Sequence, residues 1–203
     1  MKLELTPDEL LSTTRAVRRR LDLERPVERE VIEDCLQLAQ QAPSGSNRQT
    51  WRFVVVTDAD KRRGLAALFR DVAQRYLAAN TGSSEGIRAG VQRLSDHLHE
   101  VPVHVIPCIE GRTDGKGVFA QASTWGSIMP AAWSFMLAAR SRGLGTVWTT
   151  FHLFREEQAA ELLGIPFDEV MQAALIPVAY TIGTEFKPAV RAPLDSFVHW
   201  DRW

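Results

Sequence analysis

Several arginines stand close together near the start of the chain, in the run Arg15-Ala16-Val17-Arg18-Arg19-Arg20. A guanidinium group is always protonated and presents a planar fork of donors that matches the oxygens of a phosphate group. Arg15 and Arg19 would share one face if the segment is helical, because residues four apart are neighbours on a helix. The run therefore indicates a phosphate site, and arginines that merely decorate a solvated helix end are the open alternative.

A group of short polar side chains follows in the segment Ala42-Pro43-Ser44-Gly45-Ser46-Asn47-Arg48-Gln49-Thr50-Trp51. A helix that stops at a Pro-Ser-Gly turn and continues into a Val-rich strand holds such side chains on a rigid loop. Ser44, Asn47 and Gln49 offer both donors and acceptors, as a planar cofactor with an amide-like edge requires. The turn by itself occurs in many loops, but its combination with these residues and the strand is more specific.

Two later segments are further candidates for a binding site. They are Gly143-Leu144-Gly145-Thr146-Val147-Trp148-Thr149-Thr150 and Arg191-Ala192-Pro193-Leu194. From the residues alone, Gly143 is a helix C-cap, Trp148 is a core aromatic and Arg191 is solvent-exposed.

Together these segments resemble the FMN-dependent nitroreductase family, whose pattern is an N-terminal basic motif, a helix, Ala-Pro-Ser-x-x-Asn-x-Gln-x-Trp and an apolar strand. The resemblance covers about 14–203 and is weakest between 79 and 118. Asp22 matches the acidic residue that closes the basic motif. Val17 departs from a common Ser, and Ala189 and Val190 stand where many members carry Lys, so Arg18 is a candidate substitute at the phosphate. The FMN contacts that the resemblance implies are Arg15, Ala16, Val17, Arg19, Pro43, Ser44, Gly45, Asn47, Gln49, Trp148, Thr149, Thr150 and Arg191.

The resemblance implies an α+β fold in which helices flank a central, mostly antiparallel sheet, and an intertwined homodimer that exchanges its C-terminal tails. It implies electron transfer from NAD(P)H to nitroaromatics or quinones by a ping-pong mechanism. The flavin carries such chemistry, so no catalytic side chain is expected. Because a Gly-x-Gly-x-x-Gly fingerprint is missing, NAD(P)H is expected to bind only transiently. Phe151 and His152 are candidates for the substrate side, although a structural role for His152 is the stronger interpretation.

Alternative functions remain open on the same residues. Flavin fragmentation or reductive dehalogenation would use the same fold, and a protein that stores or senses flavin would bind it without turnover. Nucleic-acid binding through the arginine run is disfavoured because the formal net charge is only −1.

Size and periodicity predict a single domain over residues 1–203, because 45% hydrophobic residues in a chain of 203 can bury a substantial core. Residues 79–100 are a candidate mobile cover over the site, with an ordinary surface helix hairpin as the open alternative. Residues 184–203 have too few apolar neighbours to form their own core and are expected to pack on a second subunit. Helices are predicted from 7 into the Arg15 region, at 26–42, after Asp58 or Asp60, after 80–86, at 118–142 and at 155–163, and strands at 51–56, 103–109, 143–150 and 171–180.

Other sites are not expected. The chain begins without an apolar signal segment and contains no apolar stretch long enough to span a bilayer, so a cytoplasmic protein is predicted. Cys35 and Cys108 are expected to be buried reduced thiols. His97, His99 and His104 lack the spacing and the additional ligands of a metal site, so no metal is predicted.

Overall fold

The computed structural model of the chain describes residues 2–82 and 84–203. Helix α1 (Pro7–Thr13) begins where the sequence predicts, because Glu9 N donates to Thr6 Oγ1 at 3.2 Å and Thr6 N donates to Glu9 Oε2 at 2.8 Å. This reciprocal capping box satisfies amides that a helix otherwise leaves unpaired. The helix ends at Thr13 and does not extend into the Arg15 region, because the chain turns extended at Thr14 (ψ 122°).

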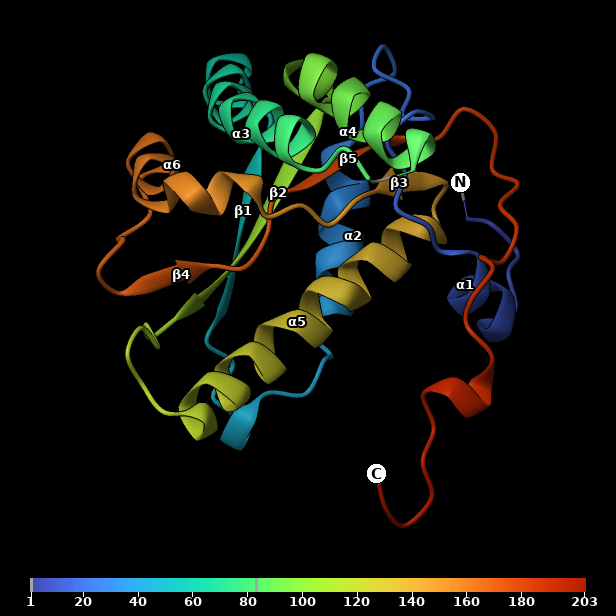
Figure 1. The fold of residues 1–203 in the computed structure, drawn as a ribbon. Coiled ribbons are helices and arrows are strands. Elements are labelled where there is room, and N and C mark those ends of the chain that lie inside the picture. The colour runs from blue at the N-terminus through green and yellow to red at the C-terminus, as the bar shows by residue number, and fades with distance from the viewer. Residues whose placement is uncertain (1, 83) are drawn as a thin grey trace.

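Within the described residues, five strands form one sheet in which every pairing is antiparallel. Figure 1 shows helices on both sides of this sheet. The strands lie in the order β1 (Trp51–Val56), β2 (Val103–Glu110), β5 (Ile176–Tyr180) and β3 (Leu144–Thr146), and the short β4 (Val170–Gln172) pairs with β2. The fold is therefore α+β with a central antiparallel sheet flanked by helices, as predicted.

The sheet separates two hydrophobic cores, and β2 contributes alternate side chains to each. Val103 and Val105 pack with α2 and α5, whereas Ile106 and Cys108 pack with α3 and α4. This period of two is the geometry of a strand that is buried on both faces. The helices are α2 (Arg29–Ala39), α3 (Ala59–Ala79), α4 (Glu85–His97), α5 (Val118–Arg140) and α6 (Glu156–Leu163).

The predicted strand 171–180 is divided into β4 and β5, and the division explains how the middle of β2 accommodates a proline. At the division, Leu175 pairs instead with Thr149, and the two N–O distances are 2.9 and 3.1 Å. Ala173 N donates to the carbonyl of Pro107 at 2.8 Å. The amide that Pro107 lacks therefore falls at an interruption of the ladder, where no partner strand requires it.

Helices α3 and α4 form the predicted helix pair around the loop at 80–86. Asp58 caps α3, since its Oδ1 accepts from Lys61 N at 2.9 Å. Val91 and Leu94 of α4 are buried in the same core as Phe69 of α3. Position 83, within the predicted cover segment, lies outside the described residues.

Helix α5 runs continuously through Pro130 and is apolar nearly all round, but only part of its circumference is buried. Ala132 and Phe135 are fully buried against the sheet. Trp133 on another side is 43% exposed in the single chain. Helix α5 is therefore not covered on all sides in the single chain, and the exposed side contains Phe119, Ala122, Gly126, Met129 and Trp133.

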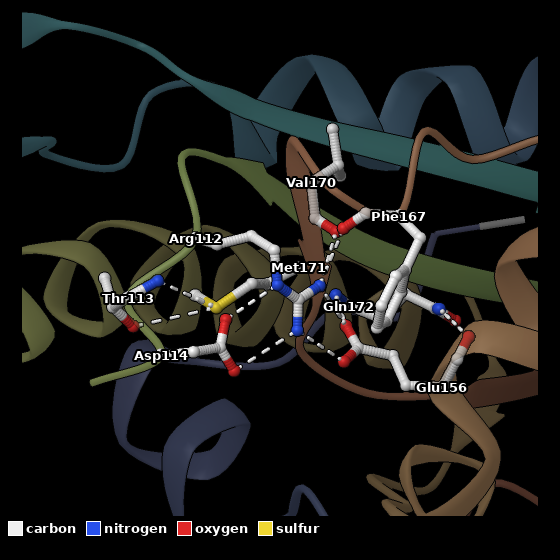
Figure 2. A network of polar contacts seen from close by, with 8 residues as sticks. All are labelled: Arg112, Thr113, Asp114, Glu156, Phe167, Val170, Met171 and Gln172. Carbon is white, nitrogen blue, oxygen red and sulfur yellow. Dashed lines mark hydrogen bonds and ion pairs between the residues drawn. The ribbon is translucent and has the colours of Figure 1, made fainter. Parts of the chain in front are cut away.

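Arg112, which follows β2, connects the start of α6 with the start of β4 (Figure 2). Its Nη2 donates to Glu156 Oε2 at 3.0 Å, and its Nη1 donates to the carbonyl of Phe167 at 2.8 Å. Hydrogen bonds to Asp114 and Glu156 raise the pKa of Arg112. The side chains of Arg112 and Glu156 are only 19% and 18% exposed, so water screens this ion pair less than a surface pair.

The two cysteines are buried and unpaired, as predicted. Burial raises the pKa of Cys35 to about 11 and that of Cys108 to about 12, so both are protonated at neutral pH. No helix in the described part of the chain is long and apolar enough to cross a membrane. The last part of the tail runs away from the body of the molecule in Figure 1, and Trp200 and Trp203 are exposed.

Candidate cofactor site

Residues 14–25 form an irregular segment, which we call the arginine segment, along one end of the sheet. Val17 N donates to Thr146 O of β3 at 2.9 Å, and Asp22 N donates to Tyr180 O of β5 at 2.8 Å. Because these amides bond to the sheet, they are not available to a helix. Arg15 and Arg19 therefore do not share a helical face, contrary to one premise of the predicted phosphate site.

Gly145 allows the arginine segment to approach β3 closely. A Cβ atom at this position would lie 2.7 Å from Thr181 Cγ2 and 3.0 Å from Leu21 Cδ2. Such distances are shorter than van der Waals contact, so only glycine fits without displacement of the segment. Gly143 has φ 76° in the turn after α5, consistent with the C-cap interpretation of the sequence.

A cavity of ≈ 950 Å³, which we call the arginine cavity, lies between the arginine segment, α4 and the tail. The segment predicted as a cover thus borders it, through Gly86 and Gly90. Its lining consists of Arg15, Ala16, Val17, Arg18, Arg19, Arg20, Gly86, Gly90, Glu185, Phe186, Lys187, Pro188, Ala189 and Val190. Most of the charged groups in this lining are cationic, so the cavity favours an anionic ligand.

The four arginines of this segment have different environments. Arg15 is half-buried and its Nη1 donates to Lys187 O at 3.2 Å, whereas Arg19 is exposed. Arg20 donates to three backbone carbonyls of the tail, so its role is structural. Arg18 is half-buried beside Gly90, and burial lowers its pKa.

The sequence indicates Arg18 only as a candidate substitute at the phosphate. In the structure, Arg18 and Arg15 both line the arginine cavity and are both half-buried. An anion beside the partly desolvated guanidinium of Arg18 would offset the cost of that burial. Neither a helical nor a strand periodicity applies to an irregular segment, so the sequence carried no signal that distinguishes Arg18 from Arg19.

The predicted polar loop is organised by its own hydrogen bonds. Gln49 N donates to Ser44 Oγ at 3.1 Å, and Gln49 Nε2 donates to Asn47 Oδ1 at 3.0 Å. Gly45 N donates to Ser127 Oγ of α5 at 2.9 Å, which fixes the loop to that helix. Asn47 and Gln49 remain exposed and can present their other polar atoms to a ligand.

The same loop contains three residues in an unfavourable backbone conformation. Ser46, Asn47 and Gln49 each have φ 53°, a region that non-glycine residues rarely occupy. Such conformations cost about 1–3 kcal/mol each and occur preferentially at functional sites. Strain and internal hydrogen bonding together support a binding role for this loop.

The segment after β3 passes from the sheet to the helical layer. Trp148 is half-buried and packs against two clusters of buried residues, one containing Phe135 of α5 and the other containing Ile128 of α5. Thr149 Oγ1 donates to Leu175 O at 2.7 Å. Thr150 is exposed, and the ring of Phe151 packs on those of Phe69 and Tyr76. Trp148 therefore belongs to the core, as the residues alone suggested.

His152 is fully buried, which favours the structural role that the sequence analysis preferred. Neither ring nitrogen has a hydrogen-bond partner among the described residues. Burial, with a smaller contribution from His104, lowers the pKa of His152 to about 4, so its ring is neutral at pH 7. In the single chain His152 does not line the arginine cavity.

One chain does not bring all the predicted contacts together. Gly45 contacts Ser127 in the first half of α5, whereas Arg140, at the end of α5, is linked through Phe186 to Arg20 of the arginine segment. The rise of a helix places Ser127 and Arg140 about 20 Å apart. The polar loop and the arginine cavity are therefore apart on one chain. Arg191 is exposed, and the lining of the cavity ends at Val190 in the described tail.

The comparison with known proteins assigns the fold and the motifs to one family. The Nitroreductase family model matches residues 11–180, which contain the arginine segment, the polar loop and all five strands. The chain belongs to the nitroreductase family. The cofactor residues that the family pattern predicted thus lie on an established family fold, although their individual contacts remain predictions.

Several members of this family resemble the chain. A 5,6-dimethylbenzimidazole synthase from Rhodospirillum rubrum is 32% identical over 62% of this chain, a match that spans 60% of that relative's length. A nitrobenzene nitroreductase from Ectopseudomonas oleovorans is 26% identical over 83% of this chain and 84% of its own length.

A crystal structure of oxidized iodotyrosine deiodinase, bound to FMN and 3-iodo-L-tyrosine, has a TM-score of 0.73 and covers 97% of this chain and 99% of that chain at 20% identity. At this identity the likeness shows a shared fold. The names of these similar proteins record different reactions.

Proposed function

We propose that this protein is an FMN-dependent oxidoreductase that transfers electrons from NAD(P)H to nitroaromatics or quinones by a ping-pong mechanism. The observation that carries this proposal is the arginine cavity of ≈ 950 Å³, which Arg15, Arg18 and Arg19 line. The chain that contains it belongs to the nitroreductase family. A phosphate monoester carries up to two negative charges and binds well to such guanidinium groups.

The residues of the cavity fit the phosphate end of FMN. Arg15 is held by the carbonyl of Lys187 and retains free donors, and the desolvated Arg18 gains most from an anion. When bound, FMN would supply the electron transfer itself. The protein groups would bind and orient it, and no acid–base pair is required among them.

A homodimer would complete this site. Ser127, which bonds to the polar loop, and Arg140, which contacts Phe186 of the cavity lining, lie about 20 Å apart along α5. We therefore propose that Ser44, Asn47 and Gln49 approach the flavin ring from the partner chain. The exposed apolar side of α5 and the exposed tail offer the surface that such a dimer would bury. Trp148, Thr149 and Thr150 would lie beside the ring from the chain that supplies the arginines.

A different reaction on the same cofactor is the second candidate. Similarity to a 5,6-dimethylbenzimidazole synthase and to an FMN-bound iodotyrosine deiodinase makes flavin fragmentation and reductive dehalogenation the alternatives. An anaerobic absorbance scan with NADPH, followed by a nitroaromatic or quinone acceptor, separates them. Rapid bleaching and reoxidation by the acceptor supports the proposed function, whereas flavin that stays oxidised under NADPH and NADH contradicts it.

The phosphate role is tested by Arg18→Ala and Arg15→Ala. Loss of one charge-assisted hydrogen bond removes about 1.5–3 kcal/mol, so FMN affinity should fall about 10- to 100-fold for each variant. Fluorescence titration of the apoprotein with FMN measures it. The matched control is Arg29→Ala, because Arg29 forms an exposed ion pair with Glu33 on α2, outside the cavity. Unchanged FMN affinity in both cavity variants would contradict the proposal.

A further inference from the structure

Phe186, in the tail that follows β5, contacts two guanidinium groups. Its ring centroid lies 4.3 Å from Arg20 Cζ and 4.9 Å from Arg140 Cζ. Both distances are within the range of a cation–π interaction. We call these three residues the Phe186 clamp.

Arg140 depends on this ring because it has little other compensation. The residue is 5% exposed, and its hydrogen bond to Thr13 Oγ1 is long at 3.3 Å. Its Nε and Nη1 atoms are buried without a hydrogen-bond partner among the described residues, and burial lowers its pKa. A buried cation without a bonded carboxylate is costly, so the negative face of the Phe186 ring contributes more here than at an exposed site.

Arg20 holds the backbone that immediately precedes the same ring. Its Nε donates to Ile182 O at 2.9 Å, its Nη2 to Gly183 O at 2.7 Å and its Nη1 to Glu185 O at 3.0 Å. The tail backbone from Ile182 to Glu185 is thus attached to the arginine segment. Phe186 is the next residue, and its position is set by this attachment together with Arg140.

The residue after Phe186 acts on the arginine cavity directly. Lys187 O accepts from Arg15 Nη1 at 3.2 Å, and both Phe186 and Lys187 line the cavity. The contacts therefore form a connected path from Arg140 through Phe186 and the Lys187 carbonyl to the guanidinium of Arg15. Displacement of Phe186 would release the carbonyl that orients Arg15.

We propose that Phe186 is a positioning residue for phosphate binding: held by Arg20 and Arg140, it fixes the Lys187 carbonyl and thereby the orientation of Arg15 in the arginine cavity. The inference rests on the proposed FMN function of this cavity. Phe186 would contact neither the flavin ring nor the reacting atoms. Its effect is restricted to the phosphate end of the cofactor.

Substitutions that separate ring electrostatics from bulk test this role. Phe186→Leu keeps an apolar side chain but removes the π-face, whereas Phe186→Trp keeps an aromatic face for both guanidinium groups. FMN and riboflavin are the probes, because riboflavin lacks the phosphate. Their affinities for the apoprotein are measured by fluorescence titration, and the FMN-to-riboflavin affinity ratio is the readout.

We expect Phe186→Leu to lower FMN affinity about tenfold and riboflavin affinity by less than about twofold, while Phe186→Trp keeps the wild-type ratio. A merely structural role would weaken both ligands equally. Equal losses for FMN and riboflavin, or an unchanged ratio in Phe186→Leu, would overturn the inference. Wild-type protein that binds FMN no better than riboflavin would instead overturn the proposed phosphate site, and with it this role.

Discussion

Two histidines, His104 and His152, are fully buried in the described part of the chain. His104 Nε2 lies 2.9 Å from Leu98 O, whereas its Nδ1 and both nitrogens of His152 have no partner there. Burial lowers the pKa of each ring to about 4. In the unfolded chain both would titrate near pH 6.5.

This difference predicts acid sensitivity in a defined pH window. Below about pH 6.5 the two histidines bind protons in the unfolded state but not in the folded state. The free energy of unfolding therefore falls as the pH drops towards 4. Each pKa unit corresponds to about 1.4 kcal/mol per histidine. We expect His152→Leu to reduce this fall by roughly half, as measured by urea unfolding at pH 7, 6 and 5. His199→Leu is the control, because that tail histidine is exposed. An identical pH profile for wild type and His152→Leu would contradict the prediction.

Among the elements, α6 and β4 are joined to the chain after β2 by one side chain, in addition to the pairing of β4 with β2. Arg112 donates to Glu156 at the start of α6, to the carbonyl of Phe167 before β4 and to that of Val170 at its start (Figure 2). Glu156 Oε1 also accepts from Gln172 N at 2.9 Å. The guanidinium therefore satisfies acceptors from α6 and from the start of β4 with one group.

Removal of this guanidinium should destabilise the fold. Arg112→Met leaves the Glu156 carboxylate and two carbonyls without their donor in a poorly screened site, and we expect a loss of about 3 kcal/mol in the free energy of unfolding. Guanidinium chloride unfolding measures it. The matched control is Arg63→Met, which breaks an exposed ion pair with Asp60 and should change stability by less than about 0.5 kcal/mol. Equal effects of the two substitutions would show that the network contributes nothing beyond a surface pair.

At the scale of the whole molecule, α5 leaves one apolar side uncovered. Phe119, Ala122, Gly126, Met129 and Trp133 recur at helical spacing, and Trp133 is 43% exposed. Figure 1 shows that α5 lies at the outside of the layer it forms with α2. Contiguous apolar surface of this kind marks an interaction site, which supports the proposed homodimer.

A charge within this surface should separate the chains. We expect Trp133→Glu to give the mass of a single chain in light scattering, and to lose FMN because each cofactor would need the polar loop of a partner. Phe154→Glu is the control, since Phe154 is 75% exposed but lies on the segment before α6. A Trp133→Glu protein that keeps the wild-type mass would contradict the dimer interface.

Local patterns were enough to predict most elements. The capping box at Thr6, the Asp58 cap and the apolar runs at 51–56 and 103–109 depend on neighbours in the chain, and the structure reproduces them. The predicted last strand failed at Ala173 because its interruption depends on Pro107 and Thr149, which are distant in sequence. A periodicity argument contains no information about such partners.

The sequence by itself indicated the family and the α+β class, through the motifs that resemble the nitroreductase family. Residue types and local spacing indicated the arginine-rich segment and the polar loop. Only the tertiary structure decided which arginines line the cavity. It assigned Arg20 to the tail carbonyls and brought Arg18 against Gly90. It also placed the polar loop at Ser127 and the cavity near Arg140, on separate parts of α5. The reason is physical: hydrogen bonding of an irregular segment, and the distance between two ends of a buried helix, depend on contacts between residues far apart in the chain.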